Sequence, residues 1–454
     1  MATSYPSIKI VQPENLQLES LKGYNPKWKE KYEWIIHTIL YKQLTTRNSF
    51  NNYVNLSSTT LQYFIGSKYQ SKVRAFLINN KVIEFNKTYS PDGFSQSYRL
   101  TEKYNNANIK AVEYGETYQE QTYCRKIFVY NKEYLNNLLK DELIRKEFLS
   151  LSYWRIDVNA ALNYIASRND YSTKQRESRK LQVYEVNNIQ HIKKEGGTIQ
   201  AKFTFKKDRA GRIHTPLTNL ASDLRKFLFQ VDAPDQETIC HDFSNSQILF
   251  FVSKYLNKKV HNIGRESRIT NPYQSTHTGE ASQTSAALSG QTHPLPYVMN
   301  NLPDINHFKK MVFAGKIYDG IMQAIQWKGT RNEFKEKFFG ELWYNSNRRG
   351  KKERVKLTEM EKVFKKAFPN VFKILWRVKA TIGNREFCLN LQREEATLMH
   401  RWIVGSIDKK VKYFVVHDAI YTTSDNSKYI GELLQDASIQ YFGEYVSIKS
   451  ELCN

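Results

Sequence analysis

Hydrophobic and polar positions near the start of the chain follow helical periodicity. Apolar residues repeat at helical spacing from Trp28 to Tyr41, which predicts a first helix. In Leu56–Leu61, hydroxyl residues stand where they cap a second helix, and a third helix follows a turn that begins at Ile65. That third helix is expected to carry three basic residues, Lys68, Lys72 and Arg74.

Two β-strands are predicted after these helices. They are Lys81–Phe85 and Ser95–Leu100, and Ser90-Pro-Asp-Gly93 between them favours a hairpin turn. Three helices and a hairpin predict a winged-helix domain over residues 1–104, a module that often lays one helix in a major groove. A winged helix that only packs against protein fits the same pattern, because a fold does not fix its ligand.

Two later segments differ in composition from their neighbours. Residues 105–200 are helical in pattern and highly charged, which predicts a helical connector or thumb-like region. Residues 261–293 are rich in Ser, Thr, Gly, Gln and His and poor in apolar residues, so we expect a flexible insertion there.

Charge narrows the class of partner. The 454-residue chain has 68 Lys and Arg against 45 Asp and Glu, a formal net charge of +23. This excess, interleaved with 29 Tyr and 25 Phe, favours a nucleic-acid partner over a membrane surface. The pattern predicts no membrane span and no secretory signal, and the four scattered Cys predict neither a zinc ribbon nor a disulfide framework. We therefore expect a cytoplasmic protein of bacterial, viral, phage or plasmid origin.

Two motifs place an aspartate at the end of a predicted strand. A short strand ends at Asp242 and a helix begins at once, with Ser244 and Gln247 at the spacing of a capping box. Farther on, two apolar strands flank His417-Asp418, which predicts a tight hairpin with a carboxylate at its tip. Each motif alone fits a helix-capping or turn-forming Asp. Together they predict two carboxylates that clamp two Mg²⁺ ions roughly 3.5–4 Å apart.

A third motif predicts a basic helix with aromatic residues. Arg331, Lys335, Phe339 and Trp343 recur every four residues and form one helical stripe. Like charges at this spacing repel each other, so the two cations fit best opposite an anion such as a triphosphate. Taken alone, the segment fits equally well a solvated basic face with Phe and Trp in a core.

A fourth motif, Asp208-Arg-Ala-Gly-Arg212-Ile-His214, precedes the others. Its Arg beside a Gly can fork onto a phosphate, although a basic hairpin turn fits the same residues. The four motifs in this order resemble the palm and fingers of family A DNA polymerases and of their relatives, the single-subunit phage and mitochondrial RNA polymerases. The resemblance covers about residues 201–454 and depends on the combination.

The resemblance implies an α+β right-hand polymerase fold and a role for each matching residue. Asp242 and Asp418 would be the catalytic carboxylates, with the Phe243 carbonyl as a further metal ligand and Mg²⁺, or Mn²⁺, as the cofactor. The residues implied in nucleotide binding are Arg331, Lys335, Phe339, Trp343, Tyr344 and Gln247, and Lys335 would also be catalytic. The residues implied in template and primer binding are Arg212, His214, Gln392 and His417, with Gln392 near the start of a helix. Helix Asn426–Tyr441 and strand Glu444–Lys449 would close the palm.

The implied activity is nucleotidyl transfer from nucleoside triphosphates to a primer on a template, with a DNA polymerase favoured. Three departures affect sugar choice: Ala419 stands where DNA polymerases of the family have Glu, Gln247 where they have a ribose-excluding Glu, and Trp343 where a Tyr is usual, with Tyr344 beside it. A single-subunit RNA polymerase or primase-like enzyme is therefore an alternative. A non-enzymatic replication initiator and a two-metal nuclease or recombinase are others, although the nuclease lacks a well-placed third acidic residue.

Overall fold

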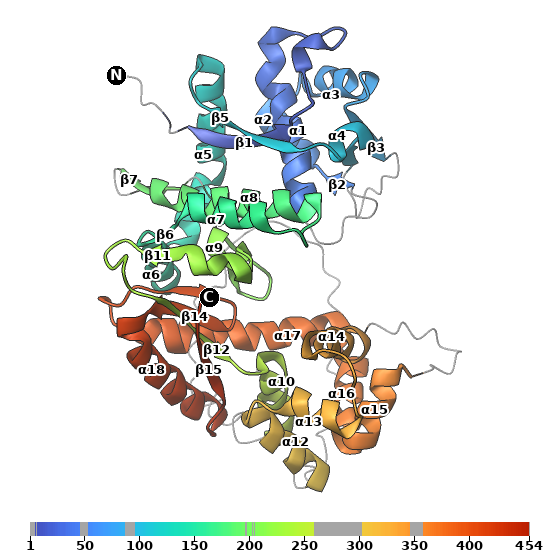
Figure 1. Ribbon diagram of the computed structural model, residues 1–454, viewed down its shortest axis with the longest axis vertical. Coiled ribbons are helices and arrows are strands. Elements are labelled where there is room, and N and C mark those ends of the chain that lie inside the picture. Colours follow the sequence, from blue (N-terminus) through green and yellow to red (C-terminus); the bar gives the residue numbers. More distant parts are fainter. Residues whose placement is uncertain are drawn as a thin grey trace, which may run out of the picture. The chain divides into compact units, whose positions relative to one another are not determined.

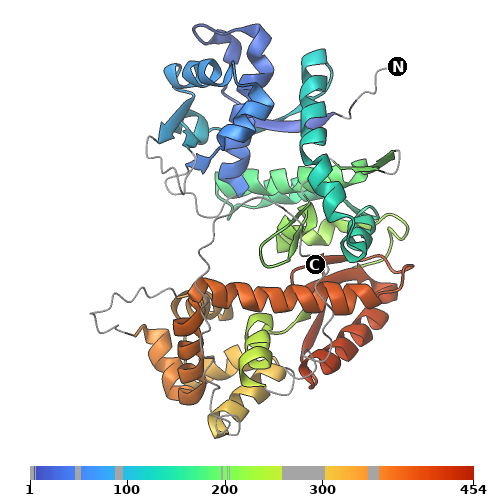
Figure 2. The same cartoon turned by 180° about the vertical axis from the view of Figure 1, so that it is seen from behind.

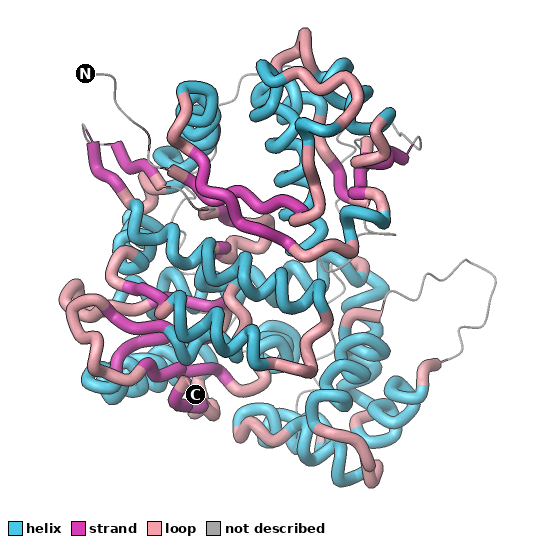
Figure 3. Tube along the Cα trace, turned by 45° about the horizontal axis from the view of Figure 1, so that its top comes forward, coloured by secondary structure: helices cyan, strands magenta, loops and turns pink. Residues whose placement is uncertain are grey.

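The computed structural model describes residues 5, 7–45, 53–86, 96–195, 198–201, 203, 205–257, 302–345 and 357–453. The predicted flexible insertion at 261–293 lies outside these residues. Contacts divide the chain into two compact units. The first contains Met1–Lys206, His214–Thr238 and Cys453–Asn454, and the second contains Lys207–Ile213 and Ile239–Leu452. Helices predominate and the sheets are small (Figure 3), so the predicted α+β class is confirmed.

The N-terminal part of the first unit combines three helices with a three-stranded sheet. The helices are α1 (Lys29–Thr45), α2 (Ser58–Ile65) and α3 (Gln70–Asn79). The strands, in the antiparallel order β2-β4-β3, are β2 (Val54–Asn55), β3 (Ile83–Asn86) and β4 (Ser97–Leu100). Figure 1 labels the three helices and the outer strands β2 and β3. The Ser57 side chain caps α2 by accepting the Thr60 N–H at 3.1 Å, as predicted. The predicted turn at Ser90–Gly93 lies outside the described residues.

The three basic residues predicted on α3 differ in their surroundings. Lys68 lies in the turn before the helix, which corrects its predicted place, and Lys72 is exposed on the helix. Arg74 donates hydrogen bonds to Gln96 Oε1 at 2.7 Å and to the Tyr98 hydroxyl at 2.6 Å. The Arg74 guanidinium is therefore held against β4 by its own unit.

The rest of the first unit is mainly helical, with short strand pairs. Strand β1 (Ile8–Pro13) pairs antiparallel with β5 (Ile109–Tyr114), so Ile8 lies opposite Tyr114. The helices are α4 (Glu102–Asn105), α5 (Tyr118–Leu138), α6 (Glu142–Leu151), α7 (Val158–Ser167), α8 (Thr173–Asn187) and α9 (Pro216–Asn219). The remaining strand pairs of this unit are β6 (Trp154–Ile156) with β11 (Leu228–Gln230), and β7 (Lys193–Glu195) with β8 (Thr198–Gln200). The short strands β9 (Lys206–Lys207) and β10 (Ile213–His214) pair with each other where the chain passes from one unit to the other and back.

The second unit is built on a four-stranded sheet with the order β13-β14-β12-β15. Strand β12 (Thr238–Phe243) pairs antiparallel with β15 (Ile448–Leu452), and β13 (Phe414–Val416) pairs antiparallel with β14 (Ala419–Thr423). Helix α18 (Ser424–Phe442) packs against β14 and β15 (Figure 1). The predicted closing helix is thus present, whereas the closing strand begins at Ile448 and not at Glu444.

Helices complete the second unit around one apolar core. They are α10 (Ser246–Phe251), α12 (Pro303–Phe313), α13 (Ile317–Ala324), α14 (Arg331–Lys337), α15 (Glu359–Ala367), α16 (Pro369–Ile382) and α17 (Asn384–Thr397). The long helix α17 continues into a π-helical segment, Leu398–Val404 (Figure 2). Phe251, Trp343 and Phe387 are fully buried in this core. Within the described residues, no helix has both the length and the apolar composition that crossing a bilayer requires.

Candidate active site

Adjacent strands of the second unit bring Asp242 and Asp418 together. Asp242 lies near the end of β12, and Asp418 lies in the loop between β13 and β14. The Phe243 N–H donates to the Asp418 carbonyl oxygen at 3.4 Å. The register of β12 and β15 also places Lys449 directly opposite Asp242. The sheet therefore gathers two carboxylates, 176 positions apart in the sequence, beside a lysine.

Two left-handed residues form the corners that carry these aspartates. His417 and Asp418 make a two-residue hairpin loop, in which His417 has a φ of +58°. Asn245 has a φ of +60° where the chain turns from β12 into α10. Left-handed backbone costs a non-glycine residue about 1–2 kcal/mol, and such strain is concentrated at functional sites.

The capping box predicted for Ser244 and Gln247 is wrong. The N-cap of α10 is Asn245, and its side chain makes no capping hydrogen bond. The Ser244 hydroxyl instead lies 3.2 Å from the Ser447 hydroxyl, while Gln247 donates to Glu395. The left-handed corner at Asn245 moves the helix start one residue beyond the position that the spacing indicated.

Both aspartates carry a raised pKa. Burial raises the pKa of Asp242 most, the charge of Asp418 raises it further, and the charges of Lys335 and Lys449 oppose the rise. Burial also raises the pKa of Asp418. The Ser246 hydroxyl, which hydrogen-bonds to Asp418, opposes that rise, as does the nearby Lys335 charge. The two groups thus form a poorly solvated pair of like charges.

One carboxylate oxygen of this pair is available to a cation. Asp242 Oδ1 is buried and has no hydrogen-bond partner among the described residues. Buried polar atoms without a partner are rare, and a missing ion or a catalytic role commonly explains them. Mg²⁺ in nucleotide-handling enzymes is typically held by one or two carboxylates, so Asp242 and Asp418 fit such an ion. In the described part of the chain, no group of three or more His, Cys, Asp or Glu is arranged to hold a metal.

Lys335 on α14 lies near the same aspartates. Burial lowers the pKa of Lys335, the charges of Arg331 and Lys449 lower it further, and Asp242 opposes this effect. The Lys335 ammonium lies 5.2 Å from the centre of the Tyr318 ring, and the Arg331 guanidinium lies 5.4 Å from the same ring. Lys335 and Arg331 thus lie side by side, and the charge of Lys335 reaches Asp242.

An ion pair keeps Arg331 in place. Arg331 Nε donates to Asp319 Oδ1 at 2.9 Å, and both side chains are partly exposed. An exposed pair of this kind contributes little to stability, about 0–1 kcal/mol. The contact therefore orients the guanidinium without preventing it from meeting another anion.

The aromatic part of the predicted stripe changes register after α14. Phe338–Trp343 is π-helical, and the Tyr344 N–H donates to the Phe339 carbonyl at 2.6 Å. The Phe339 and Tyr344 rings consequently stack, with centres 5.2 Å apart and planes at 24°. Trp343 is fully buried and stacks on Phe338. The predicted place of Trp343 beside Phe339 is therefore wrong, and Tyr344, which is 40% exposed, occupies that face.

A buried ionic network lies next to Asp418. Arg212 Nη2 lies 2.6 Å and 2.7 Å from the two carboxylate oxygens of Glu395, and Gln247 Nε2 donates to Glu395 at 2.8 Å. Burial and the charge of Asp418 raise the pKa of Glu395 to about 7, against the opposing effects of Arg212 and Gln247. Sequence reasoning missed Glu395, which lies three residues after the predicted Gln392 on α17.

The turn that carries Arg212 is fixed by Asp208. Asp208 Oδ1 accepts the Ala210 N–H at 2.8 Å and the Arg212 N–H at 3.0 Å. Gly211 has a φ of +89°, which a side chain would strain, and an added Cβ there would lie 3.6 Å from Ala396 Cβ. Asp208 and Gly211 thus position the Arg212 side chain toward α17.

The remaining predicted residues are placed as follows. Gln392 is half-buried in the middle of α17, which begins at Asn384, so its predicted position near a helix start is wrong. Phe243, predicted as a carbonyl ligand, ends β12 with a buried side chain. His214, Lys68, Lys72 and Arg74 belong to the first unit. Lys449, which no sequence motif indicated, lies opposite Asp242 on β15.

Comparisons with known proteins give a weak likeness. No protein-family model and no curated protein sequence matches the chain. Among solved structures, the chain is similar to the POL domain of Pol1 from M. smegmatis in complex with DNA primer-template and dNTP, with a TM-score of 0.29 and 12% sequence identity. The match covers 65% of this chain and 55% of that one, so the chain spans about half the length of its neighbour. A likeness of this size assigns neither a family nor an activity.

Proposed function

We propose that the chain is a template-directed nucleotidyltransferase, a DNA polymerase of the family A type. The observation that carries this proposal is the pairing of Asp242 and Asp418 beside the cationic side chain of Lys335. Phosphoryl transfer depends on positioning and charge neutralisation more than on covalent chemistry. The site offers an anionic pair for divalent cations and, next to it, cations for phosphate groups.

The proposed reaction is attack of a primer 3′-hydroxyl on the α-phosphate of a nucleoside triphosphate, with release of pyrophosphate. Asp242 and Asp418, with the Phe243 carbonyl, would hold Mg²⁺ or Mn²⁺, which supplies Lewis-acid stabilisation of the developing negative charge when bound. Arg331 and Lys335 bind the triphosphate. Burial lowers the pKa of Lys335, which suits it to donate a proton to the departing pyrophosphate.

Neighbouring groups position the substrates. Phe339 and Tyr344 present a stacked aromatic pair to the nucleotide base. Arg212, which is held by Glu395, contacts the template and primer. Gln392, on the same helix as Glu395, and His417, in the loop between β13 and β14, contact them as well. The Gln247 side chain donates a hydrogen bond to Glu395, so this carboxylate fixes its orientation toward the sugar of the nucleotide.

The N-terminal part of the first unit is proposed to be a winged helix that binds duplex DNA. Its order of helix, strand, two helices and two strands supports this proposal, as do the exposed Lys68 and Lys72. A replication initiator would need only this part, and would bind DNA without incorporating nucleotides.

Primer extension tests the proposal. Deoxy- and ribonucleotides are offered separately on primed and unprimed templates, with Mg²⁺ or Mn²⁺. We expect deoxynucleotide incorporation on a primed template, abolished in Asp242→Ala and Asp418→Ala and reduced about 10²–10³-fold in Lys335→Ala. The matched control is Asp436→Ala, which removes an exposed carboxylate on α18 and should leave the rate unchanged.

Other results of these assays would indicate a different function. Incorporation of ribonucleotides alone identifies an RNA polymerase, and synthesis on an unprimed template identifies a primase-like enzyme. DNA binding by the wild type without incorporation supports the initiator. Loss of DNA binding together with incorporation in the Asp242 and Asp418 variants argues against the assignment of these residues to catalysis.

A further inference from the structure

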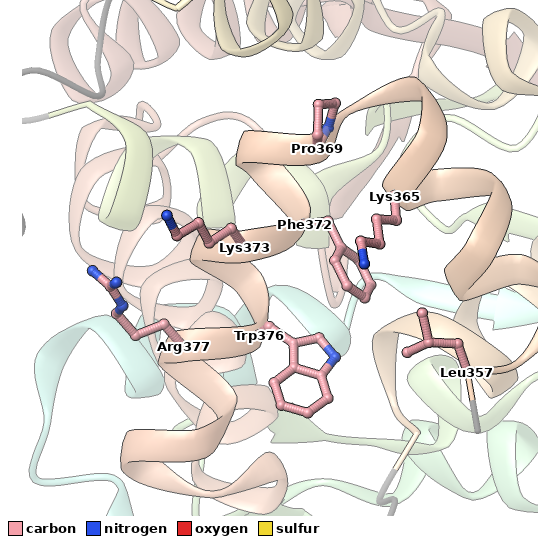
Figure 4. Close-up of a pocket in the computed structure, with 7 residues that line it drawn as sticks. All are labelled: Leu357, Lys365, Pro369, Phe372, Lys373, Trp376 and Arg377. Carbon is pink, nitrogen blue, oxygen red and sulfur yellow. The ribbon is translucent and has the colours of Figure 1, made fainter. Parts of the chain in front are cut away.

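A groove lies between the end of α15 and one face of α16, and its lining includes none of the residues of the candidate active site. It encloses a cavity of about 580 Å³. The half-buried Trp376 and the largely buried Phe372 supply its aromatic lining, and Lys365, Lys373 and Arg377 supply its charge (Figure 4). Leu357 and Pro369 complete the lining. No residue of the groove has a part in the proposed reaction.

Helical spacing arranges the lining of α16 into two rows. Phe372 and Trp376 are four residues apart, with ring centres 6.5 Å apart and planes at 46°. Lys373 and Arg377 follow each of them by one residue and are also four apart, so both extend along the same edge of the helix (Figure 4). Lys365 reaches the aromatic row from α15 on its other side (Figure 4). Cations thus flank the aromatic row on both sides.

Among the residues that the structure describes, no acidic side chain neutralises the charge of the groove. Residues 359–382 contain six Lys or Arg and two Glu. Glu359 pairs with Lys362 at 2.6 Å, and Glu361 accepts the Thr358 N–H at 3.0 Å, so both acids are used elsewhere. Within the described residues, none of the three cations of the groove forms an ion pair, and Lys373 repels Arg377 across one helical turn. An anionic ligand would relieve that repulsion.

We propose that this groove binds a single strand of nucleic acid. Bases stack on Trp376, supported by Phe372, while backbone phosphates pair with Lys365, Lys373 and Arg377. Stacking platforms within a basic channel are the general means of holding single strands without reading sequence. An acidic peptide would satisfy the cations alone, whereas a single strand also uses the aromatic side chains that line the groove. A duplex keeps its bases stacked inside and gives Trp376 nothing to stack on.

Binding is measured by fluorescence anisotropy with a labelled oligodeoxythymidine of about 20 nucleotides. This length exceeds the roughly 4–16 nucleotides that one single-strand site covers. Lys373→Ala/Arg377→Ala should lower the slope of log K against log salt by about 1.4, because each phosphate contact contributes about 0.7. Lys362→Ala/Lys366→Ala is the matched control: it removes two charges from the same region outside the groove and should keep the wild-type slope.

Substitutions at Trp376 test the stacking. Trp376→Ala should weaken binding about tenfold, and Trp376→Phe should recover most of the loss. If Trp376→Ala fails to fold by circular dichroism, the charge variants and Trp376→Phe decide the question. Asp242→Ala should bind the oligonucleotide like the wild type, so failure of the proposed catalytic function leaves this test intact.

Three results would overturn the proposal. The first is wild-type affinity and salt slope in the Lys373→Ala/Arg377→Ala variant. The second is a duplex of the same length that binds as tightly as the single strand and loses affinity equally in the groove variants. The third is competition by polyglutamate as strong as that by unlabelled oligodeoxythymidine, which would assign the groove to an acidic protein.

Discussion

Replacing Asp242 with Asn should make the fold more stable above neutral pH, although it removes the proposed activity. The wild-type protein holds two carboxylates together in a poorly solvated site, and the pKa of each is raised. Asn keeps the shape of the side chain and removes one of the two like charges. The variant should therefore lose an electrostatic penalty that the wild type carries.

The sign and size of the effect follow from the direction of the pKa shifts. In the folded protein both pKa values lie above the ordinary value of 3.8, so the folded state binds more protons than the unfolded state above about pH 4. The raised pKa values therefore stabilise the folded state fully below that pH, and this stabilisation is lost as the pH rises through the pKa values of the folded protein. One pKa unit corresponds to about 1.4 kcal/mol. With allowance for partial solvent screening, we expect Asp242→Asn to gain about 1–3 kcal/mol over the wild type at about pH 8.

Chemical denaturation in the presence of a chelator, at a series of pH values from about 4 to 8, measures the difference. Asp436→Asn, an exposed change of the same charge on α18, should stay within about 0.5 kcal/mol of the wild type. Added Mg²⁺ should stabilise the wild type and have little effect on Asp242→Asn, because only a state that binds the ion gains from it. A variant that is less stable than the wild type at about pH 8, or a difference that does not grow with pH, would refute the reasoning.

Three other predictions concern the surroundings of the site. Trp343→Ala should destabilise the second unit by about 3–5 kcal/mol in denaturation experiments because it empties a buried site, whereas the exposed Tyr344→Ala should cost under about 1 kcal/mol and raise the KM for nucleotide. Burial raises the pKa of Glu395 from an ordinary 4.5 to about 7, so the wild type loses the stabilising contribution of this group as the pH rises between these values. Glu395→Gln has no carboxyl to titrate there, so its unfolding free energy should fall by about 1–3 kcal/mol less than that of the wild type over the same pH range. Gly211→Ala should lower the unfolding free energy by about 1–2 kcal/mol, since its φ of +89° disfavours a side chain; an unchanged melting curve would contradict that.

Local periodicity predicted helices better than it predicted pairing. The first helix was expected at Trp28–Tyr41 and extends over Lys29–Thr45, because its apolar repeat is continuous. The pairing of β1 with β5 had no local signal, since an antiparallel ladder between distant segments depends on tertiary contacts. The closing strand β15 was placed about four residues too early for the same reason, because its register against β12 is set by that partner.

In the candidate site, too, the local sequence pattern predicted more than the pairing of strands. The sequence pattern placed Asp242 at a strand end and Asp418 at a hairpin tip, and both lie at corners of one sheet. Lys449 was missed because only the strand register brings it opposite Asp242. The stripe assigned to Trp343 assumed 3.6 residues per turn, and that period does not hold where backbone hydrogen bonds span five residues.

The π-helical segment Phe338–Trp343 has a consequence for comparing chains of this kind. An α-helix would bring the fourth residue after Phe339 onto its face, whereas here the fifth residue, Tyr344, stacks on it. The segment therefore behaves as an ordinary helix into which one extra residue has been inserted. With Gly340 discounted, Arg331, Lys335, Phe339 and Tyr344 recur at a uniform interval of four. An alignment of such chains without a gap would therefore place Trp343, and not Tyr344, beside Phe339.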